Sequence, residues 1–541
     1  MQTKNGKTVL LRVFCLLCAL TMAAGLLTAC GKGKGNGTQT TEERTEARTG
    51  ANGTTGTEAV ETDEWGQKTY DDVVPKDLDY EGTTVNILMR QLDASDPRRY
   101  EWFVDSIESA DDLSEAIWFR NQEIEEELGV RLKFTQKPDS EINTAISTAA
   151  LGGGDGVDLI SHYHYYATST ETMNYYKNVM HPDFTYLHLS NPYWNQNFIR
   201  YATTQGTEAN DRLFVLQGDM NLSTFMTTFC MYFQKNLLQN RCNLSDSELY
   251  KLTLDGKWTI DKLISLVRDT ATLQDETKDA EGNIYGFTSH YQVHAYDGFL
   301  AAFDIDLTQV SDKGKHTLLN STAQRKLQQA ADKLVTFYRS NDAYLVGNNP
   351  NDVTYGGSYT TPVAAFRQSR SVFCVAGMGD YKHLSEMPQD SWGLLPLPKY
   401  EESQTAYYAG VQDSHNTVAV MYGSNKNYEM LSAVLELFAS KSYATVRPQL
   451  FNRIIKGQKL QDSQSSKVFD LIMNSTRWDF SDIYPTAVKD VRNTLWRDAL
   501  GGAVYGSGDG AAAVISALSK NKDTMNDALE TLDGWLYSHY N

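Results

Sequence analysis

The chain has 541 residues and carries 68 acidic against 49 basic side chains, which gives a formal net charge of -19. This length exceeds what one hydrophobic core organises, so two or more lobes are expected. The acidic balance argues against nucleic acid and against an anionic membrane surface as partners.

The N-terminus has the pattern of a secretory signal. Three basic residues precede an apolar stretch of about 15 residues, too short for an ordinary membrane span, and small residues follow it. The stretch ends in LTAC at Cys30, which resembles the lipobox of bacterial lipoproteins. That resemblance implies a signal peptide over residues 1–29, cleavage before Cys30, and lipidation of its thiol. Acyl chains on Cys30 would hold the mature chain on a membrane.

Residues 30–79 are predicted to form a disordered tether. Between Cys30 and Trp65 the sequence has no aromatic residue and few apolar ones, so it cannot bury enough surface to offset the cost of ordering. A flexible coil of roughly 35 residues spans about 30 Å on average. The folded part, roughly 460 residues, is therefore expected to lie just off the membrane.

Three cysteines remain after the signal and the lipidated residue are set aside: Cys230, Cys242 and Cys374. Because three is an odd number, at least one thiol stays free, and their spacing indicates neither a zinc site nor a disulfide framework. Buried thiols are the expected state.

The first part of the folded chain predicts strands that alternate with helices. Residues 84–89 (TVNILM), 130–134 and 157–160 are short β-rich runs. Between them, apolar residues at helical spacing predict one helix that ends at Gly129 and a second over residues 140–151. This order predicts a parallel sheet with right-handed crossovers.

Further strands are predicted along the rest of the chain, with a helix entered through GKWT and an extended segment fixed by two prolines at residues 392–400. The predicted strands are residues 213–217, 228–233, 283–287, 372–375 and 417–420.

The segment GGGDGVDLISHYHYY, residues 152–166, is predicted as a turn, a buried strand and a strand-end loop. Ligands of such sheets sit beyond the carboxyl ends of the strands, where this loop emerges. If the chain stays extended there, Tyr163 and Tyr165 point to the side opposite His162 and His164. One of these pairs would then reach a ligand.

Seven segments, together with the lipobox and tether, resemble in their order the extracellular solute-binding proteins of the carbohydrate type (family 1), which serve ATP-binding-cassette importers. The resemblance runs from about residue 80 to 440, and residues 441–541 show helical patterns without a match. The segments are GGGDGVDLI, MYFQKNLL, DGKWTIDKLISLVRDTA, EGNIYGFT, VAAFRQSRSVFCVAGMGDY, WGLLPLPKY and AGVQDSHNTVAV.

The resemblance implies an α/β, two-lobed periplasmic-binding-protein-like fold (type II), in which each lobe is a mixed sheet flanked by helices and the lobes close on a ligand cleft. The first lobe is expected to comprise residues 81–218 plus 325–385, and the second residues 219–324 plus 386–541. It also implies a monomer, anchored at the extracellular face of the bacterial cytoplasmic membrane, that captures a carbohydrate, in particular an oligosaccharide, and delivers it to permease subunits. Neither a catalytic step nor a cofactor is expected.

Saccharide binding needs aromatic planes for C–H faces and planar polar groups for hydroxyls. The loops GMGDY and AGVQDS match loops that carry ligand contacts in the family, which adds weight to Asp380, Tyr381 and Asp413. Trp478 and Asp479 are a weaker pair from the unmatched part. The candidate ligand contacts, all at predicted strand ends or in hinge-facing loops, are Arg90, His162, Tyr163, Tyr165, Asp219, Asn221, His290, Tyr291, Tyr296, Asp380, Tyr381, Asp413, Ser414 and His415.

Alternative functions were weighed on the same residues. The spacing of His162 with His164, and of His290 with His294, suits zinc, but no HExxH motif, cysteine ligand or His-rich loop accompanies them, so no metal site is expected. No G-x-S-x-G, P-loop or strand-linked G-x-G-x-x-G motif indicates an enzyme. Two alternatives stay open: binding of another solute, a peptide or a metal, and a secreted glycoside hydrolase with two cleft carboxylates.

Overall fold

The computed structural model describes residues 73–538, with gaps, so the predicted signal peptide, Cys30 and most of the tether lie outside the described residues. The tether was expected to reach residue 79, yet Val74 is 3% exposed and belongs to the hydrophobic core. The folded part therefore begins before residue 80. The gaps are residues 94–95, 97, 99–100, 105–106, 108–110, 206–210, 275–281, 292, 312–313, 347–360, 385–386, 389 and 461.

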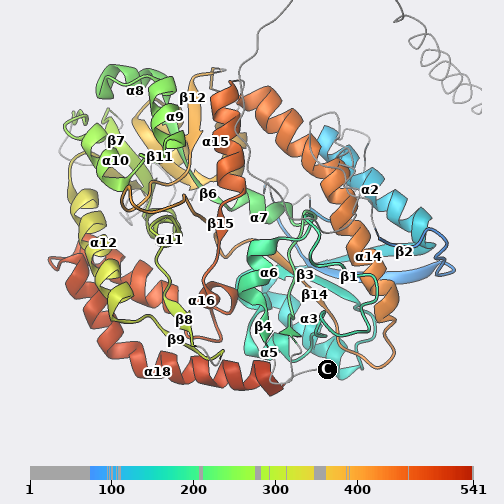
Figure 1. Cartoon of the computed structure of the whole chain (residues 1–541). Helices are drawn as coiled ribbons and strands as arrows, with labels where there is room; N and C mark the ends of the chain where they lie inside the picture. The colour runs from blue at the N-terminus through green and yellow to red at the C-terminus, as the bar shows by residue number, and fades with distance from the viewer. Residues whose placement is uncertain are drawn as a thin grey trace, which may run out of the picture. The chain divides into compact units, whose positions relative to one another are not determined.

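The first sheet has the strand order β14-β3-β1-β2 (Figure 1). Its three N-terminal strands run parallel, with Ile87 of β1 opposite both Phe134 of β2 and Leu159 of β3. The predicted parallel sheet is thus confirmed, and β14 adds an antiparallel edge. The strands are β1 (Thr83–Arg90), β2 (Val130–Lys137), β3 (Leu159–Tyr163) and β14 (Asn416–Val420), and the connecting helices are α2 (Asp112–Leu128) and α3 (Asp139–Leu151).

The helix α2 shows why these residues form this element. The Asp111 side chain caps its N-terminus by accepting a hydrogen bond from the Ser114 backbone N–H, while Gly129 ends it in the left-handed conformation with φ 60°. Ile117, Ile124 and Leu128 on one face of the helix are fully buried, and the helix packs on β2 and α14. The predicted helix and its glycine cap are confirmed.

The second sheet has the strand order β10-β7-β11-β6-β12. The strands β10 and β11 run parallel to β7, whereas β6 runs antiparallel to β11 and β12. Every residue of β6, β7 and β11 is buried, as expected for central strands covered on both faces. The strands are β6 (Phe229–Gln234), β7 (Tyr285–His290), β10 (Ala343–Val346), β11 (Ser371–Gly377) and β12 (Trp392–Leu395).

The sheet pairing differs from the expected division into lobes. Residues 325–385 were expected in the first lobe, but β10 and β11 lie in this range and belong to the second sheet. Conversely, β14 lies within residues 386–541 and pairs with β3 of the first sheet, with Val418 opposite Ser161. The sequence of an apolar strand such as β11 does not indicate which strand it pairs with, because the edge of any buried strand can supply its backbone hydrogen bonds.

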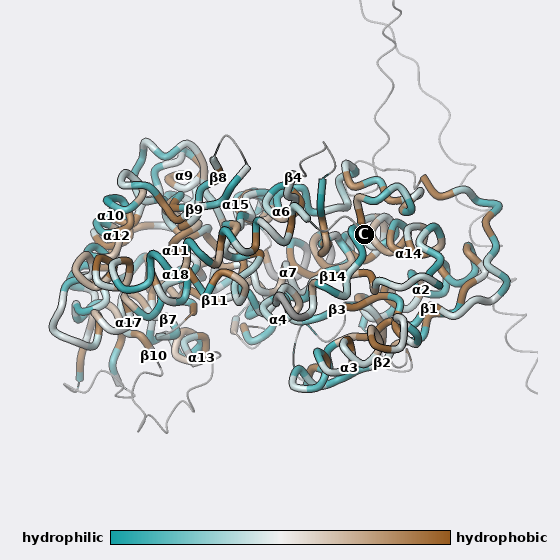
Figure 2. The backbone as a smooth tube through the Cα atoms, turned by 90° about the horizontal axis from the view of Figure 1, so that it is seen from below, coloured by the Kyte–Doolittle hydropathy of each residue, from teal (hydrophilic) through white to brown (hydrophobic). Residues whose placement is uncertain are grey.

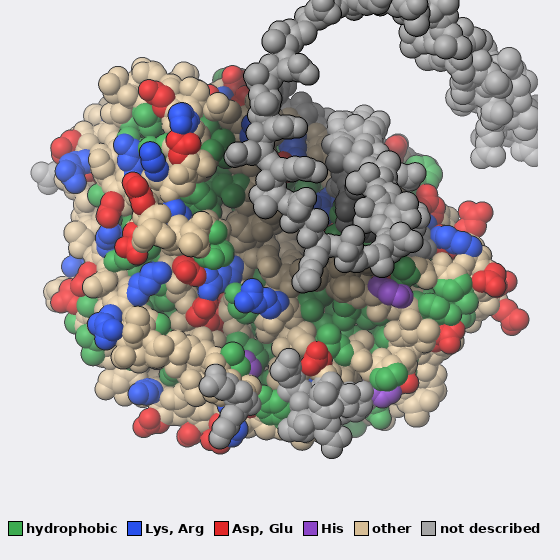
Figure 3. Space-filling model, viewed as in Figure 1, with side chains coloured by type: hydrophobic (Ala, Val, Ile, Leu, Met, Phe, Trp, Pro, Cys, Tyr) green, Lys and Arg blue, Asp and Glu red, His purple; other side chains and the backbone are tan. Residues whose placement is uncertain are grey.

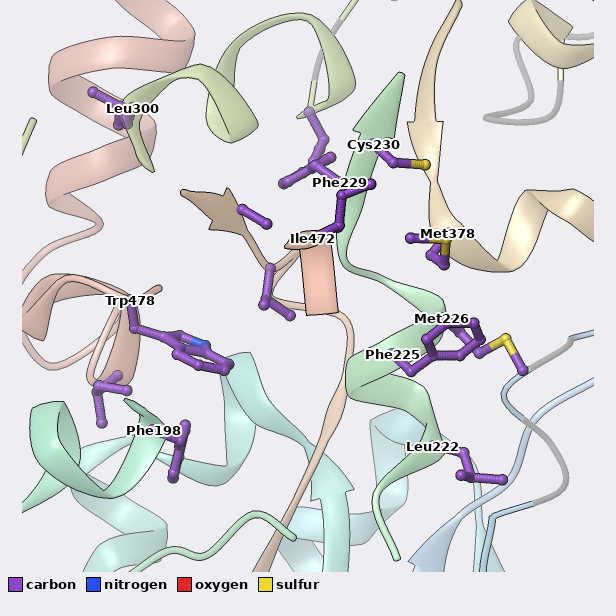
Figure 4. Packing of buried hydrophobic residues seen from close by; sticks show 14 of the residues in the cluster. Phe198, Leu222, Phe225, Met226, Phe229, Cys230, Leu300, Met378, Ile472 and Trp478 are labelled. Carbon is purple, nitrogen blue, oxygen red and sulfur yellow. The ribbon is translucent and has the colours of Figure 1, made fainter. Parts of the chain in front are cut away.

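The segments that join the sheets pack apolar side chains around α7 (Leu222–Met226). Figure 4 shows Leu222, Phe225 and Met226 of α7 beside Phe229 of β6, all at most 4% exposed. The segment before α7, residues 213–217, is buried but forms only an isolated bridge, Leu216 with Val418, instead of the predicted strand. Its neighbour β14 is already paired in register with β3.

Residues 441–541, which the sequence left unmatched, contact both parts of the fold, since η2 packs on α2 and α15 packs on β12. The helix α14 packs on α2, and α18 runs along α12 (Figures 1 and 2). These helices and π-helical segments are α12 (Ser321–Arg339), α14 (Tyr428–Lys441), η2 (Ser442–Val446), η3 (Gln449–Lys459), α15 (Ser463–Met473), α16 (Phe480–Ile483), η4 (Asn493–Arg497), α17 (Asp498–Tyr505) and α18 (Gly510–Ser538).

The surface and the remaining elements complete the fold. Basic and acidic side chains are intermingled over the face seen in Figure 3. Within the described residues, no helix has the length and apolarity needed to cross a membrane. The thiols of Cys230, Cys242 and Cys374 are unpaired. The remaining elements are α4 (His164–Ala167), α5 (Thr170–Met173), α6 (Gln196–Ala202), β4 (Thr204–Gln205), β5 (Asp211–Arg212), α8 (Lys235–Cys242), α9 (Asp246–Leu254), α10 (Ile260–Val267), α11 (Val293–Ala302), β8 (Thr308–Val310), β9 (His316–Leu318), α13 (Thr361–Arg367), η1 (Met378–Leu384), β13 (Ala409–Gly410) and β15 (Thr476–Arg477).

Candidate functional site

The carboxyl ends of β1 and β3 bring Arg90 and Tyr163 together. The Arg90 guanidinium lies 4.6 Å from the Tyr163 ring centroid, and its Nη2 lies 2.7 Å from Asp139 Oδ2. Its Nη1 donates to the Ser414 carbonyl at 3.0 Å. Because Arg90 is 6% exposed and fully engaged, it holds the Tyr163 ring and the Ser414 backbone in place.

Three tyrosines gather beyond β3. The ring centroids of Tyr163 and Tyr165 are 6.1 Å apart, and each lies 5.1 Å from the Tyr166 ring. Tyr166 is 40% exposed, while the other two are half-buried. The Tyr163 hydroxyl lies 3.5 Å from Asp413 Oδ1, and burial, followed by the Asp413 charge, raises the Tyr163 pKa. The rings therefore offer edges and faces next to a carboxylate.

A buried arginine connects Asp413 to two further carboxylates. Arg492 Nη2 lies 3.0 Å from Asp413 Oδ2, its Nη1 lies 2.9 Å from Asp482 Oδ1, and its Nε lies 3.5 Å from Asp297 Oδ2. Burial opposes the charge on Arg492, yet these carboxylates together raise its pKa. Arg497 also pairs with Asp297, through Nε at 3.0 Å. The network holds the Asp413 carboxyl group in place beside the Tyr163 hydroxyl.

The second sheet contributes Asp380, which lies in η1 just after β11. Its Oδ2 accepts a hydrogen bond from the Gly377 backbone N–H at 2.9 Å. Burial raises the Asp380 pKa to about 7, against the opposing effects of that hydrogen bond and of the Arg98 charge. Arg98 pairs with Asp96 at 2.5 Å and donates to the Ser414 carbonyl at 3.1 Å. Its charge thus acts on Tyr163 from one sheet and Asp380 from the other.

We call Arg90, Arg98, Tyr163, Tyr165, Tyr166 and Asp413 the Tyr163 cluster. The histidine candidates lie behind it rather than in it. His162 is fully buried and bonds Asn143 Oδ1 through Nε2 at 3.0 Å, and His164 donates from Nε2 to the Asp482 carbonyl at 2.9 Å. His415 stacks on His164 at 4.5 Å. Burial lowers the pKa of His162 to about 3 and of His164 to about 4, so both stay neutral.

The chain does not stay extended over residues 162–165, although the two pairs still separate, with the tyrosines in the cluster and the histidines behind it. Strand β3 ends at Tyr163 and α4 begins at His164, so the last two residues follow helical spacing. His162 and His164 consequently bond different elements, α3 and α16. The tyrosines come together through this change of secondary structure.

Most of the candidates from the second sheet and α11 are buried. His290 is 1% exposed at the strand end, and its ring lies 4.9 Å from that of half-buried Tyr291. Tyr296 is a core residue of α11, with its carbonyl bonded by Trp496 Nε1 at 2.8 Å. Tyr381 is likewise buried at 4%. Of these residues, Tyr291 retains appreciable exposure.

The weaker pair, Trp478 and Asp479, is structural. Trp478 is 2% exposed and packs edge-on against Phe198 at 5.5 Å. Asp479 caps α16 and accepts a hydrogen bond from the Thr308 hydroxyl at 2.7 Å. Both side chains hold the C-terminal part against the rest of the fold.

Asp219 and Asn221 are not part of the Tyr163 cluster, although Asn221 Nδ2 donates to the Asn416 carbonyl at 3.5 Å and the Asn416 side chain accepts from Arg90 Nη1 at 3.4 Å. Asn221 Nδ2 donates to Glu101 Oε1 at 2.9 Å, and Asp219 Oδ2 pairs with Arg447 Nη1 at 3.1 Å. Both residues line a separate cavity of about 260 Å³ beside α7.

Sequence reasoning missed Arg98, Tyr166, Asp297, Arg492 and Arg497. Tyr166 could have been found, since it continues the run HYHYY. The segment DVRNTLWRDA holds two arginines, but nothing local marks their partners, which lie up to 200 positions away. Long-range pairing alone brings these charges to the site.

No family model matches the chain, and no curated protein matches it. Among solved structures, the chain is similar to a cyclic alpha-maltosyl-1,6-maltose binding protein from Arthrobacter globiformis, with 11% identity, coverage of 83% of this chain and 100% of that chain, and a TM-score of 0.51. It is also similar to a family 1 extracellular solute-binding protein from Bifidobacterium longum subsp. infantis (12%, 83% and 99%, 0.48). A third similar structure is an ABC substrate-binding protein from Listeria monocytogenes in complex with cycloalternan. It has 11% identity, covers 83% of this chain and 99% of that chain, and has a TM-score of 0.46. The first similarity shows the fold: the described chain has the mixed α/β architecture of a two-lobed solute-binding protein.

Proposed function

We propose that this protein is the extracellular solute-binding component of an ATP-binding-cassette importer and that it captures a carbohydrate, in particular an oligosaccharide. The observation that carries the proposal is the Tyr163 cluster: three adjoining tyrosine rings beside fixed guanidinium and carboxylate groups, at the carboxyl ends of β1 and β3. Sugars present C–H faces and hydroxyls, which these two kinds of group bind. The similar Arthrobacter protein binds cyclic alpha-maltosyl-1,6-maltose, which supports the same class of solute.

Tyr165 and Tyr166 would stack on sugar faces, while Asp413, Arg98 and the Tyr163 hydroxyl would bond sugar hydroxyls. A micromolar affinity needs about 8 kcal/mol. Each aromatic contact contributes roughly 0.5–1.5 kcal/mol beyond buried area, and each hydrogen bond to a charged group roughly 1.5–3 kcal/mol. Two rings, two such bonds and one weaker bond of about 0.5–1.5 kcal/mol to the neutral Tyr163 hydroxyl together bracket this value. Arg90 and Arg492 would act by positioning the contacts.

The second sheet would complete the site from the opposite side. Asp380 and Tyr291 follow the carboxyl ends of β11 and β7, and Arg98 already acts electrostatically on Asp380. We take the lobes to be the two sheets with their helices, joined by the segments around α7 and before β14. A solute between Tyr163 and Asp380 would be enclosed when the lobes close.

Delivery follows from the same proposal. The lipobox-like LTAC would place a lipid on Cys30 and hold a monomeric protein at the outer face of the cytoplasmic membrane, from which it passes its solute to permease subunits. The role is that of a binding protein without a catalytic step.

The test is a thermal-shift screen of mono- and oligosaccharides, with peptides and divalent metals as controls. A ligand that binds only the native state raises the melting temperature. We expect an oligosaccharide to raise it without being consumed. A shift produced by metals or peptides alone would sink the carbohydrate proposal, and release of shorter sugars over hours would favour a hydrolase.

Tyr166→Ala tests the cluster itself. Loss of a stacking ring is expected to weaken binding of that oligosaccharide by roughly three- to tenfold in calorimetric titration. Tyr422→Ala is the matched control, because Tyr422 is 46% exposed, close to the 40% of Tyr166, and lies outside the cluster. Equal oligosaccharide affinities of the two variants would contradict the proposal that the Tyr163 cluster binds the solute.

A further inference from the structure

A cavity of about 260 Å³ lies beside α7, lined by residues distinct from the Tyr163 cluster; we call it the α7 pocket. The helix α6, which flanks it, packs against α4 through the rings of Phe198 and His164, whose centroids are 5.7 Å apart, and in Figure 2 α7 lies between α6 and α4. Its outer residues, among them Pro192, Gln196 and Asn474, are exposed, while Leu222 and Thr224 at its base are buried. The opening is therefore reachable from solvent and the base is enclosed.

A fixed ion pair forms the polar wall of the α7 pocket. Arg447 Nη1 lies 3.1 Å from Asp219 Oδ2, and the two side chains keep 26% and 23% exposure. The Arg447 guanidinium lies 5.2 Å from the Tyr443 ring centroid and 5.3 Å from that of Phe451. Held by two rings and a carboxylate, it presents its remaining N–H groups in one orientation.

Aromatic side chains form the apolar wall. The rings of Phe225 and Phe451 lie 4.9 Å apart, and Phe451 is half-buried. Asn197, whose Nδ2 donates to the Thr476 carbonyl at 2.8 Å, adds an amide on the rim. The pocket thus combines ring surfaces, a carboxylate, a guanidinium and an amide.

The charge and size of the pocket select the class of ligand. Asp219 and Arg447 compensate each other, so a charged ligand would compete with an existing pair, whereas hydroxyls can donate to the carboxylate and accept from the guanidinium without disrupting it. Pockets for drug-sized ligands enclose about 300–1,000 Å³, so this one suits a smaller molecule.

We propose that the α7 pocket binds one small neutral polyol, the size of a single sugar ring, at a site separate from the solute site. The inference does not rest on the proposed importer function, because it uses no residue of the Tyr163 cluster. Since α7 leads directly into β6 of the second sheet, the polyol would sit against a segment that joins the two lobes.

The experiment is saturation-transfer NMR on the purified full-length protein with D-glucose and myo-inositol as probes, and D-glucuronate and D-glucosamine as charged controls. We expect saturation of at least one neutral probe and weaker saturation of the charged ones. Asp219→Asn keeps the shape of the side chain but removes the acceptor charge. We expect it to weaken the affinity for the neutral probe on the order of tenfold. Asp255→Asn, in the exposed Lys251 pair, is the control.

The design separates this site from the solute site. The proposal predicts that Asp219→Asn loses the ring polyol with unchanged near-ultraviolet circular dichroism and unchanged oligosaccharide affinity, while Tyr166→Ala keeps the ring polyol. Absence of saturation by both neutral probes would overturn the proposal. So would a signal that survives Asp219→Asn, that disappears in Tyr166→Ala, or that is stronger for a charged control.

Discussion

Arg492 is 7% exposed and pairs with carboxylates from three parts of the chain: Asp297 on α11, Asp413 before β14 and Asp482 on α16. Removing one partner from such a buried set leaves uncompensated charge, which costs far more than losing an exposed ion pair. The set therefore fixes Asp413 beside the Tyr163 ring. In the proposed site, Arg492 would therefore position Asp413 without contacting the solute itself.

The buried histidines make stability depend on pH. The His164 pKa in the folded protein is about 4, below the ordinary value of 6.5, because burial disfavours the charged ring. Between pH 6.5 and 4 the unfolded chain thus binds a proton that the folded chain excludes. The contribution of neutral His164 to the free energy of unfolding is therefore complete above pH 6.5 and is lost as the pH falls toward 4. It amounts to about 3 kcal/mol.

His164→Gln tests this dependence, since the amide can still donate to the Asp482 carbonyl. Urea unfolding at several pH values should show that the free energy of unfolding falls less steeply between pH 6.5 and 4 in the variant than in the wild type. Parallel curves for the two proteins would contradict the buried, neutral state of His164.

At the scale of elements, local patterns predicted β1, β2, α2 and α3 well, because apolar periodicity and caps act within a few residues. Strand β3 begins two residues later than predicted and extends to Tyr163. Residues 213–217 carry the apolar pattern of a strand, but only Leu216 pairs with the free edge of β14, whereas Leu213 accepts a hydrogen bond from the Val179 backbone N–H instead. Pairing thus overrides propensity there.

Gly129→Ala tests the cap of α2. Gly129 has φ 60°, and an added Cβ would lie 2.0 Å from Asp79 Oδ1, so the variant should lose roughly 1–2 kcal/mol of unfolding free energy in urea titration. Gly502 lies in α17 with open space around its Cα and no left-handed φ. Gly502→Ala should instead gain roughly 0.5–1 kcal/mol. A gain at Gly129 would refute the strained cap.

At the scale of the whole molecule, solute capture by two lobes implies a change of compactness. The oligosaccharide found in the thermal-shift screen is expected to lower the radius of gyration in small-angle X-ray scattering, because closure brings the two sheets around the solute. Tyr166→Ala at the same sugar concentration should show a smaller decrease. An unchanged radius under saturating oligosaccharide would argue against closure.

The sequence by itself determined the secretory pattern, the alternating strands and helices from β1 to β3, and the resemblance from which the two-lobed α/β fold followed. Only the tertiary structure decided that β10 and β11 join β6 and β7, that β14 joins β3, and that Asp219 lies in the α7 pocket. Periodicity and capping are set by near neighbours in the chain, whereas burial and ion pairing depend on partners hundreds of residues away. For that reason Arg90, Tyr163, Tyr165 and Asp413 could be predicted near the site, while Arg98, Arg492 and Arg497 could not.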